Sequence, residues 1–264
     1  MVYLEINPVV FSVGPITVHW YGVMYLLGFG LAFLYCYQNR AKDPQKPWTV
    51  DELLDLFFYG ALGDIFGGTW GYLLMYQSGW FTTAPLQALR FWEPGRSFHG
   101  GLLGVMVSML FFGRQYQRSF WAVCDFIAPA VPLGIAMGRL GNFINGELWG
   151  RVTTVPWAIH FPHAGLMARH PSALYECILE GLILFIILCS YRSKPRATGA
   201  VSALFLIGYG LLRMIAECFR EPDWHQGFVA WNFLTMGQVL CVPMILAGVW
   251  IFSRVHSTTV CARQ

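Results

Sequence analysis

Charged side chains are scarce in this chain of 264 residues. Asp, Glu, Lys and Arg together make up 12% of the residues, whereas hydrophobic residues make up 56% and the mean hydropathy is +0.51. A soluble domain carries roughly 25% charged residues. The composition therefore excludes an ordinary soluble domain and indicates an integral membrane protein.

Runs of like charge are also missing from the sequence. The formal net charge is only +3, and the Lys and Arg residues are scattered along the chain. Proteins that bind nucleic acid concentrate basic residues in one patch, so we expect no nucleic-acid partner. The sequence also lacks internal repeats and low-complexity tracts. These features favour a single polytopic domain over residues 1–264.

Cysteine pairs at metal-binding or redox spacing are not found. The seven cysteines include no CxxC pair, and most lie inside apolar runs; they are Cys36, Cys124, Cys177, Cys189, Cys218, Cys241 and Cys261. We expect small buried apolar residues here rather than disulfide partners or metal ligands. The N-terminus has no basic region and no small-residue cleavage site, so we expect the first apolar segment to remain in the mature chain.

Seven apolar runs approach the roughly 20 residues that a helix needs to cross a bilayer. The third is short and would have to draw on its flanking residues. We therefore expect an all-α membrane protein with seven transmembrane helices. The candidate spans are residues 16–37, 53–76, 98–113, 121–138, 173–190, 199–218 and 234–252.

Basic residues in the loops predict the orientation. Loops 38–52, 114–120 and 191–198, with the C-terminal tail, hold ten Lys and Arg residues, whereas the other loops hold six. Cytoplasmic loops carry the excess, so we expect the N-terminus outside and the C-terminus inside. The longest outer loop, roughly 139–171, then forms a small extracytoplasmic cap. Within it, "TTVPWAIHFP" suggests a short extended segment.

The stretch "GRLGNFINGELWGR" (138–151) interrupts the apolar pattern. Its fourteen residues include two Arg, two Asn, one Glu and four Gly. Arg139 and Arg151 offer planar donor forks that suit phosphate, and Asn142 and Glu147 add polar groups beside them. The glycines permit tight turns. A loop that only extends its charges to the interface explains too little of this pattern.

A second polar cluster lies in "YGLLRMIAECFREPD". Tyr209, Arg213 and Glu217 are spaced by four and fall on one face of a helix, and Arg220 lies near that face. The pair of Arg213 and Glu217 supports two interpretations. It is either a structural ion pair that holds helices together, or an anion site that faces a polar cavity. Ionisable residues inside a membrane favour the functional interpretation.

Two further polar positions give weaker signals. His99 begins the third span in "FHGGLLG", and histidine is a residue type often used in proton transfer. A single His at a helix start is more often a cap or a surface residue. Tyr21 lies in "HWYG", where aromatic residues at a span end are ordinary interface anchors. Taken alone, neither residue identifies a site.

Other signals concern helix packing. Glycines at four-residue spacing in the second span predict close helix contact; they are Gly63, Gly67 and Gly71. Asp64 in the same span is costly in hydrocarbon, so we expect it to face protein or water. Pro129 and Pro132 predict a break in the fourth span.

The polar clusters all map to the outward ends of the predicted spans, where the unexplained outer arginines also lie. They predict an anion site, for a lipid phosphate, that opens to the outer leaflet. A membrane transporter for an anionic solute or lipid is the main alternative, because it too needs broken helices and intramembrane charge. A lipid-binding protein without catalysis is a third reading. On these residues alone, enzyme and transporter are evenly matched.

The motifs closely resemble those of the bacterial prolipoprotein diacylglyceryl transferases. "GRLGNFINGELWGR" is similar to the signature of this family, and other motifs match in the family's order over nearly the whole chain. They are "HWYG" (19–22), "FHGGLLG" (98–104), "RHPSALYE" (169–176), "YGLLRMIAECFREPD" (209–223) and "TMGQVLCVPMILAG" (235–248).

The resemblance implies an enzyme of the bacterial inner membrane with seven transmembrane helices. Such an enzyme transfers diacylglycerol from phosphatidylglycerol to the thiol of the lipobox Cys in a preprolipoprotein, and it releases glycerol 1-phosphate. This is the first step of lipoprotein maturation. Neither a metal nor an organic cofactor is implied.

The resemblance also implies functional residues. The implied catalytic residues are Arg139, Arg213, His99, Tyr21 and Glu217. The implied phosphatidylglycerol-binding residues are Arg139, Asn142, Glu147, Gly150, Tyr209, Arg213 and Arg220. One departure stands out, because members of the family usually read Gly-Gly-Arg in the second span, where this chain has Thr69. An arginine expected near the site is therefore missing.

Overall fold

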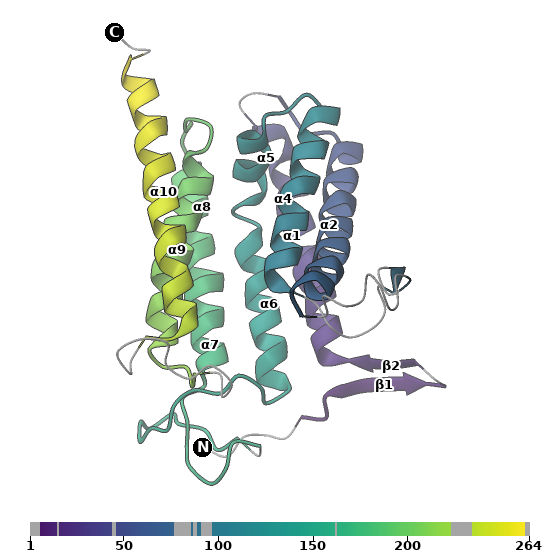
Figure 1. Ribbon diagram of the computed structural model, residues 1–264, viewed down its shortest axis with the longest axis vertical. Helices are drawn as coiled ribbons and strands as arrows, with labels where there is room; N and C mark the ends of the chain where they lie inside the picture. Colours follow the sequence, from purple (N-terminus) through teal and green to yellow (C-terminus); the bar gives the residue numbers. More distant parts are fainter. Residues whose placement is uncertain are drawn as a thin grey trace. The chain divides into compact units, whose positions relative to one another are not determined.

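The computed structural model is mostly helical. It describes residues 6–14, 16–43, 46–76, 86, 89–90, 97–161, 163–222 and 234–261. The chain, which Figure 1 draws as a ribbon, divides into two compact units by its internal contacts. Unit 1 comprises Met1–Tyr35 and Ile127–Gln264, and unit 2 comprises Cys36–Phe126. The sequence prediction of one domain over the whole chain stays a prediction.

Four helical segments of the described chain are long and apolar enough to cross a membrane. They are Trp20–Lys42, Ser172–Arg192, Ala200–Glu217 and Met236–His256. A fifth span results if α5 (Phe120–Ile127) and α6 (Val131–Ile144) together cross the membrane.

The second and third predicted spans also form helices, α2 (Val50–Tyr76) and α4 (Phe98–Gln115). Neither is among the segments that meet the criteria of length and apolarity. Repeated glycines in both helices, and Asp64 in α2, lower their hydropathy. Seven spans and the orientation of the termini therefore stay predictions.

The first predicted span begins too early. Residues 16–19 form a β-strand, β2 (Ile16–His19), which pairs antiparallel with β1 (Val9–Val13). Gly14 between the strands has φ +58°, a left-handed conformation that glycine adopts without strain. Helix α1 (Trp20–Asn39) follows directly. Three consecutive β-branched residues at 16–18 favour a strand over the first turn of a helix.

The predicted break in the fourth span is confirmed. Helices α5 and α6 are separated at Ala128–Ala130, which contains Pro129, and Pro132 lies in the first turn of α6. Proline is tolerated there because the first backbone N–H groups of a helix lack partners within it. The predicted end of this span at residue 138 is wrong, since α6 continues to Ile144. Half of the polar stretch 138–151 is therefore helical rather than part of a cap loop.

The fifth predicted span contains a π-helix. Helix α7 (Ser172–Glu176) passes into the π-helical segment η3 (Cys177–Ile183) and then into α8 (Leu184–Arg192). π-Helical turns are rare and are frequent at functional sites. This feature was not predicted from the sequence, because hydrophobic periodicity does not distinguish a π-helix from an α-helix within an apolar run.

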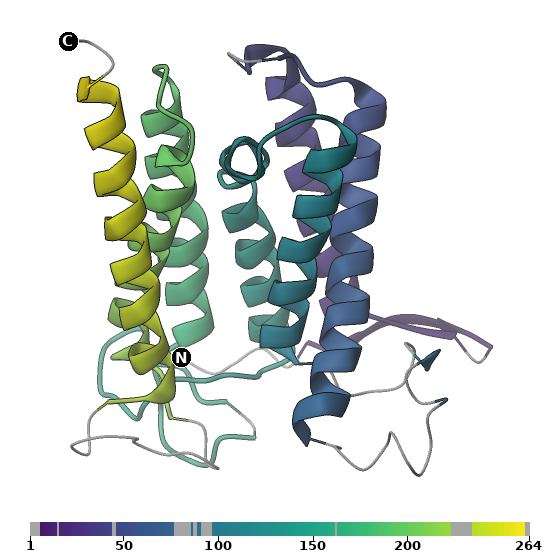
Figure 2. The same cartoon turned by 45° about the horizontal axis from the view of Figure 1, so that its top comes forward.

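Helices α8, α9 (Ala200–Glu217) and α10 (Met236–Cys261) run side by side in unit 1 (Figure 2). Small residues bring α9 and α10 together. A Cβ atom added at Gly210 would lie 2.5 Å from Ile245, and one at Gly248 would lie 2.9 Å from the carbonyl oxygen of Ala203. Tight packing of this kind is what holds helices together in lipid.

The close packing predicted for the second span is confirmed within unit 2. A Cβ atom at Gly67 would lie 2.8 Å from the Cα atom of Gly104 in α4, and one at Gly71 would lie 2.6 Å from the Cα atom of Gly100. The glycines of "FHGGLLG" therefore serve helix packing. Asp64 faces α4, because a Cβ atom at Gly101 would lie 2.5 Å from its carboxylate.

A buried ion pair fixes the start of α2 within unit 2. Arg118 donates to Glu52 at 2.9 Å, and both side chains are buried. The guanidinium of Arg118 also lies 3.8 Å from the ring centroid of Trp48, which stacks on Phe126 at 4.1 Å. The segment after the short helix η1 (Arg40–Lys42) is therefore held against the turn between α4 and α5.

The cysteines have mixed environments in the described part of the chain. Cys36 and Cys241 are buried as expected, whereas Cys218 is exposed. Its Sγ atom lies 3.6 Å from the side-chain amide of Gln238. The expectation of burial is therefore wrong for Cys218.

We predict that Gly67→Ala destabilises the protein, because the new methyl group must enter the backbone of α4. Overpacking of this kind costs about 1–3 kcal/mol. Gly60→Ala is the matched control on the same helix, because its Cβ atom meets nothing within 4 Å. Thermal unfolding in detergent micelles measures both. Equal melting temperatures for the two variants would contradict the described packing of α2 against α4.

Candidate functional site

Three arginines and three glutamates meet in unit 1. They come from α6, α7, η3, α9 and the segment that follows α9, and they are Arg139, Arg213, Arg220, Glu176, Glu180 and Glu217. We call these six residues the charge cluster. Four of them were predicted from the sequence, and two, Glu176 and Glu180, were not.

Glu176 contacts all three arginines of the charge cluster. Its Oε2 atom lies 2.8 Å from Nε of Arg139 and 3.0 Å from Nη1 of Arg213. Its Oε1 atom accepts a hydrogen bond from Nη1 of Arg220 at 3.4 Å. One carboxylate therefore joins α6, α7 and the chain beyond α9.

Glu180 and Glu217 complete the charge cluster. Oε1 of Glu180 accepts a hydrogen bond from Nη1 of Arg213 at 3.2 Å, and its Oε2 atom lies 3.7 Å from Nη2 of Arg139. Oε2 of Glu217 lies 2.6 Å from Nη2 of Arg213, one helical turn away. The hydroxyl of Thr235 donates to Oε1 of Glu217 at 3.1 Å. The structural ion pair considered for Arg213 and Glu217 is thus present.

The charge cluster is buried and has no net charge. The side chains of Glu176 and Glu180 are 0% exposed, whereas those of Arg139 and Arg213 are 20% and 12% exposed. Three positive and three negative groups cancel. Buried charges are tolerated only when they are paired, so the burial depends on this balance. Because their side chains are partly exposed, Arg139 and Arg213 are accessible to a ligand, whereas Glu176 and Glu180 are not.

The local sequence explains why these side chains meet. Glu176 and Glu180 are four residues apart at the junction of α7 and η3, and Arg213 and Glu217 are four apart on α9. Gly181 lets η3 approach α6, because a Cβ atom there would lie 2.6 Å from that of Ala136. The two carboxylates are thereby brought beside α6, which carries the first arginine.

The end of α6 forms a Schellman motif. The backbone N–H of Gly146 bonds the carbonyl of Phe143 at 3.0 Å, and that of Glu147 bonds the carbonyl of Asn142 at 2.9 Å. Gly146 has φ +66°, as this motif requires. The side-chain amides of Asn142 and Asn145 donate to the carboxylate of Glu147 at 3.4 and 3.1 Å. The turn therefore brings together two residues that were predicted as lipid-binding.

Gly150 lies where three chain segments converge. Its N–H bonds the carbonyl of His170, and it forms a β-bridge with Arg220. A Cβ atom would lie 2.5 Å from the carbonyl oxygen of Phe219 and 2.6 Å from Cβ of His170. Only glycine fits this position without a shift of the backbone. Gly150 thus supports the position of Arg220 rather than offering a side chain.

The two predicted tyrosines lie in unit 1. Tyr21 contacts the polar stretch 138–151, because a Cβ atom at Gly141 would lie 3.1 Å from Cδ2 of its ring. Tyr209 lies one helical turn before Arg213 on α9. Its ring stacks on Phe205 at 5.8 Å and packs against the apolar cluster around Leu184. Tyr21 is therefore placed against α6, and Tyr209 is placed by apolar packing around α8 and α9.

His99 and Thr69 belong to unit 2. His99 is an exposed residue in the first turn of α4, where Ser97 caps the helix by accepting a hydrogen bond from the N–H of Gly100. Thr69, at the position where the resemblance led us to expect an Arg, is buried in α2. The charge cluster is described within unit 1 alone.

The segment between α6 and α7 corresponds to the predicted cap and begins after Ile144. Its extracytoplasmic position stays a prediction, and we call the segment the cap. Among its described residues, the extended segment predicted at 153–162 pairs through an isolated bridge of Ile159 with Arg169 rather than within a sheet. Arg151 was predicted to donate hydrogen bonds to a phosphate. Its Nε–H instead donates to the carbonyl of Arg220 at 2.9 Å. Arg169 pairs with Glu221 at 3.2 Å. These arginines hold the cap together.

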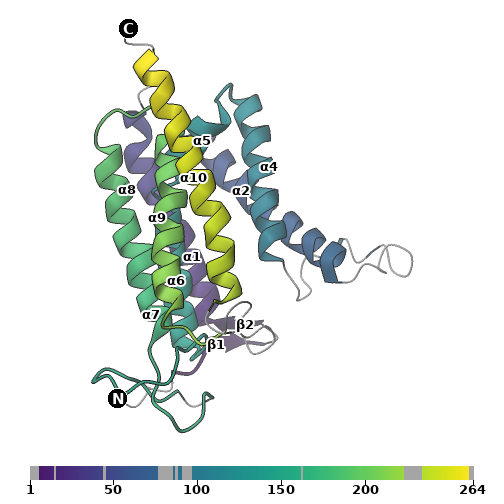
Figure 3. The same ribbon diagram turned by 60° about the vertical axis from the view of Figure 1, so that its left-hand side comes forward.

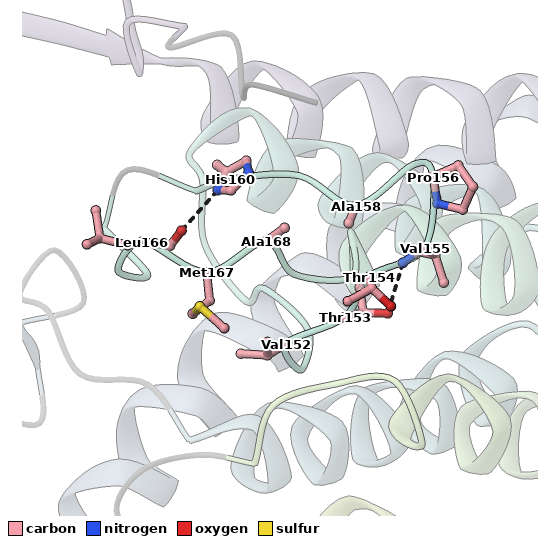
Figure 4. Close-up of a pocket in the computed structure, with 10 residues that line it drawn as sticks. All are labelled: Val152, Thr153, Thr154, Val155, Pro156, Ala158, His160, Leu166, Met167 and Ala168. Atoms are coloured by element: carbon pink, nitrogen blue, oxygen red, sulfur yellow. Dashed lines mark hydrogen bonds between the residues drawn. The ribbon is translucent and has the colours of Figure 1, made fainter.

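The cap forms an open pocket of about 330 Å³ on its surface (Figure 4). Its lining is mostly apolar and includes Val152, Pro156 and Met167. A hydrogen bond between the ring of His160 and the carbonyl of Leu166, 3.2 Å long, crosses its rim. None of the residues predicted from the sequence as catalytic or lipid-binding lines this pocket.

An aromatic group lies between the cap and the charge cluster. The indole N–H of Trp157 donates to the hydroxyl of Tyr175 at 2.6 Å, and that hydroxyl lies 3.1 Å from Nδ1 of His170. Phe219 packs edge-on against His170 and Tyr175. Because the indole of Trp157 can only donate, the tyrosine hydroxyl accepts from it. Burial lowers the pKa of His170, which favours its neutral ring.

The family model for prolipoprotein diacylglyceryl transferase matches residues 8–254 of the chain. The phosphatidylglycerol–prolipoprotein diacylglyceryl transferase of Legionella pneumophila strain Philadelphia 1 is 56% identical over 252 residues, which cover 96% of this chain and 98% of the relative. The transferase of the same name from Coxiella burnetii strain RSA 331 is 54% identical over 247 residues, which cover 93% and 94%. The chain belongs to the prolipoprotein diacylglyceryl transferase family.

Membership of this family identifies the protein as a transferase and confirms the resemblance read from its motifs. The region matched by the family model includes every residue of the charge cluster. Two members of the cluster, Glu176 and Glu180, were not predicted from the sequence. The available signal was their four-residue spacing inside an apolar run, where unpaired carboxylates are costly.

We predict that His170 makes the cap less stable at acid pH. Its pKa is lower in the folded than in the unfolded protein, so the unfolded state binds more protons. This contribution to stability is fully present above the unfolded pKa of about 6.5 and is lost as the pH falls below that value. The melting temperature of the wild type should therefore fall more steeply between pH 7 and 5 than that of His170→Gln. Parallel curves would contradict the prediction.

Proposed function

We propose that the protein transfers the diacylglyceryl group of phosphatidylglycerol to the thiol of a lipobox Cys in a preprolipoprotein. The observation that carries this proposal is the pair formed by Arg139 and Arg213. Their guanidinium groups share the carboxylate of Glu176 and remain partly exposed. Two adjacent planar donor forks suit the oxygens of a phosphate group. The curated relatives carry the name of this activity.

The reaction requires charge stabilisation more than covalent help from the protein. The substrate thiol, with an ordinary pKa near 8.5, loses its proton before its sulfur attacks. The sulfur forms a bond to the glyceryl carbon, and the bond from that carbon to the phosphate oxygen breaks with its electron pair on the oxygen. The phosphate group gains charge as this bond breaks. Arg139 and Arg213 stabilise that charge as preorganised donors.

The released product is glycerol 1-phosphate, and the proton from the thiol balances its charge. His99 is our candidate for the base, because histidine is the residue that most often serves as a general base in enzymes. Tyr21 positions the lipid or the thiol, and Glu217 orients Arg213. No metal or organic cofactor has a part in this scheme.

The other site residues have supporting roles in the proposal. Asn142 and Glu147 hold the turn that follows α6, and Gly150 lets the chain fold closely around it. Tyr209 and Arg220 bind at the periphery of the phosphate group. Their hydrogen bonds and packing in unit 1 support these roles.

We further propose that the protein crosses the bacterial inner membrane seven times, with its N-terminus outside and its C-terminus in the cytoplasm. The excess of basic residues in one set of loops supports this orientation. The β1–β2 hairpin and the cap lie at the same end of unit 1 (Figures 1 and 3). In this orientation that end faces outward, and the charge cluster opens to phosphatidylglycerol in the outer leaflet.

We predict that Arg139→Ala and Arg213→Ala abolish thioether formation. Loss of one donor that stabilises transition-state charge commonly costs about 10²–10³ in rate. The assay incubates purified protein with phosphatidylglycerol and a lipobox peptide, and mass spectrometry detects the gain of one diacylglyceryl group on Cys. Membrane insertion of each variant is checked separately.

Arg254→Ala is the matched control, because Arg254 is an exposed residue near the end of α10 and lies 5.6 Å from the ring centroid of Trp250. We expect wild-type rates from it. Transfer at wild-type rates by Arg139→Ala would exclude the proposed role of the arginine pair. Flux of an anionic solute through proteoliposomes, without peptide lipidation, would favour a transporter instead.

A further inference from the structure

The charge cluster is already neutral, and this affects how it can bind an anion. Arg139 and Arg213 contact carboxylates of the same chain at 2.6–3.7 Å. A phosphodiester would add one negative charge to a buried cluster of three positive and three negative groups. An unbalanced buried charge is strongly unfavourable. The phosphate must therefore replace a carboxylate rather than join the cluster.

Glu180 is the most weakly held of the three carboxylates. Its two arginine contacts are 3.2 and 3.7 Å long, whereas Glu176 has contacts of 2.8 and 3.0 Å and Glu217 has one of 2.6 Å. Glu217 also accepts a hydrogen bond from the hydroxyl of Thr235. Glu180 is therefore the carboxylate that a phosphate displaces at the lowest cost.

The Oε2 atom of Glu180 is fully buried and accepts no hydrogen bond within the described part of the chain. Oε2 atoms of Glu176 and Glu217 share this property, but each lies within 3.0 Å of a guanidinium nitrogen. When a phosphate takes Arg139 away from Oε2 of Glu180, the negative charge of this carboxylate is no longer balanced and has to be neutralised. Protonation achieves this, because a neutral carboxyl group is far less costly to bury than a carboxylate.

We propose that Glu180 is an exchangeable counter-ion for the arginine pair. When phosphatidylglycerol binds, its phosphate takes over the arginine contacts of Glu180, and Glu180 takes up one proton from water. The cluster then holds three guanidinium groups, two carboxylates and one phosphate, and it remains neutral. This inference rests on the proposed function, because it assumes that the ligand is the phosphate of that lipid.

The π-helix gives Glu180 this position. Glu180 lies within η3, where the wider turn shifts side chains relative to a regular α-helix. The charged or titratable groups that face it come from each neighbouring helix. They are Arg139 on α6, Glu176 on α7, Tyr209 and Arg213 on α9, and Cys241 on α10.

Proton uptake makes lipid binding depend on pH with a defined sign. The phosphodiester keeps its single charge between pH 6 and 8.5, so a change in affinity over this range comes from the protein. Binding that takes up one proton weakens as the pH rises, and the dissociation constant increases about tenfold per pH unit. In Glu180→Gln the side chain is already neutral. Its affinity should be independent of pH and tighter than that of the wild type at pH 8.5.

Isothermal titration calorimetry tests this inference directly. Short-chain phosphatidylglycerol is titrated into the purified full-length protein in detergent, in two phosphate-free buffers with different enthalpies of ionisation. The difference in heat gives the number of protons taken up. We expect about one for the wild type at pH 7.5 and none for Glu180→Gln. Glu221→Gln, which removes a carboxylate of the cap, should behave as the wild type.

Either of two results would overturn the inference. One is lipid binding by the wild type without proton uptake. This measurement uses the wild type alone, so it does not depend on the folding of any variant. The other is undiminished uptake in Glu180→Gln, which would move the proton to another group such as His99. Thioether formation by the wild type is measured on the same preparation. Its absence would refute the proposed function, whereas its presence without proton uptake refutes only the role of Glu180.

Discussion

The contact of one buried carboxylate with three guanidinium groups is the constraint on which the rest of unit 1 depends. Glu176 has no exposed surface, and its two oxygens contact Arg139, Arg213 and Arg220. An unpaired carboxylate at such a place would cost several kcal/mol. Each arginine comes from a different part of the chain, so α6, α9 and the segment after α9 must approach α7 together. The need to neutralise Glu176 therefore fixes three connections of the fold at once.

The smaller features of unit 1 follow from this requirement. Gly181 allows η3 to lie close to α6, and Gly150 allows the cap to cross behind Arg220. The Schellman motif ends α6 just after its arginine and turns the chain toward the cap. At that turn Leu148 has φ +53°, and its carbonyl accepts a hydrogen bond from the hydroxyl of Ser172. The strained residue is thus tied to the start of the helix that carries Glu176.

The sequence predicted those parts of the site that depend on local spacing. The four-residue spacing of Arg213 and Glu217 predicted their ion pair, and the glycines of α2 predicted its close contact with α4. It did not predict Glu176 and Glu180 as site residues, because both lie in a run that is apolar enough to cross a membrane. The π-helix that positions Glu180 also leaves no mark in hydrophobic periodicity. Partners that meet across helices, rather than along one helix, need tertiary information.

The neutrality of the charge cluster changes how its variants have to be interpreted. Removal of an arginine takes away hydrogen-bond donors for the phosphate, but it also leaves a buried carboxylate without its partner. Removal of Glu180 instead leaves guanidinium groups that a phosphate can neutralise. The two kinds of change therefore act in opposite directions on ligand binding, although both break the same ion pairs. A site that only holds helices together would lose stability in both cases and would show no such difference in sign. This difference separates the structural from the functional interpretation of intramembrane ion pairs.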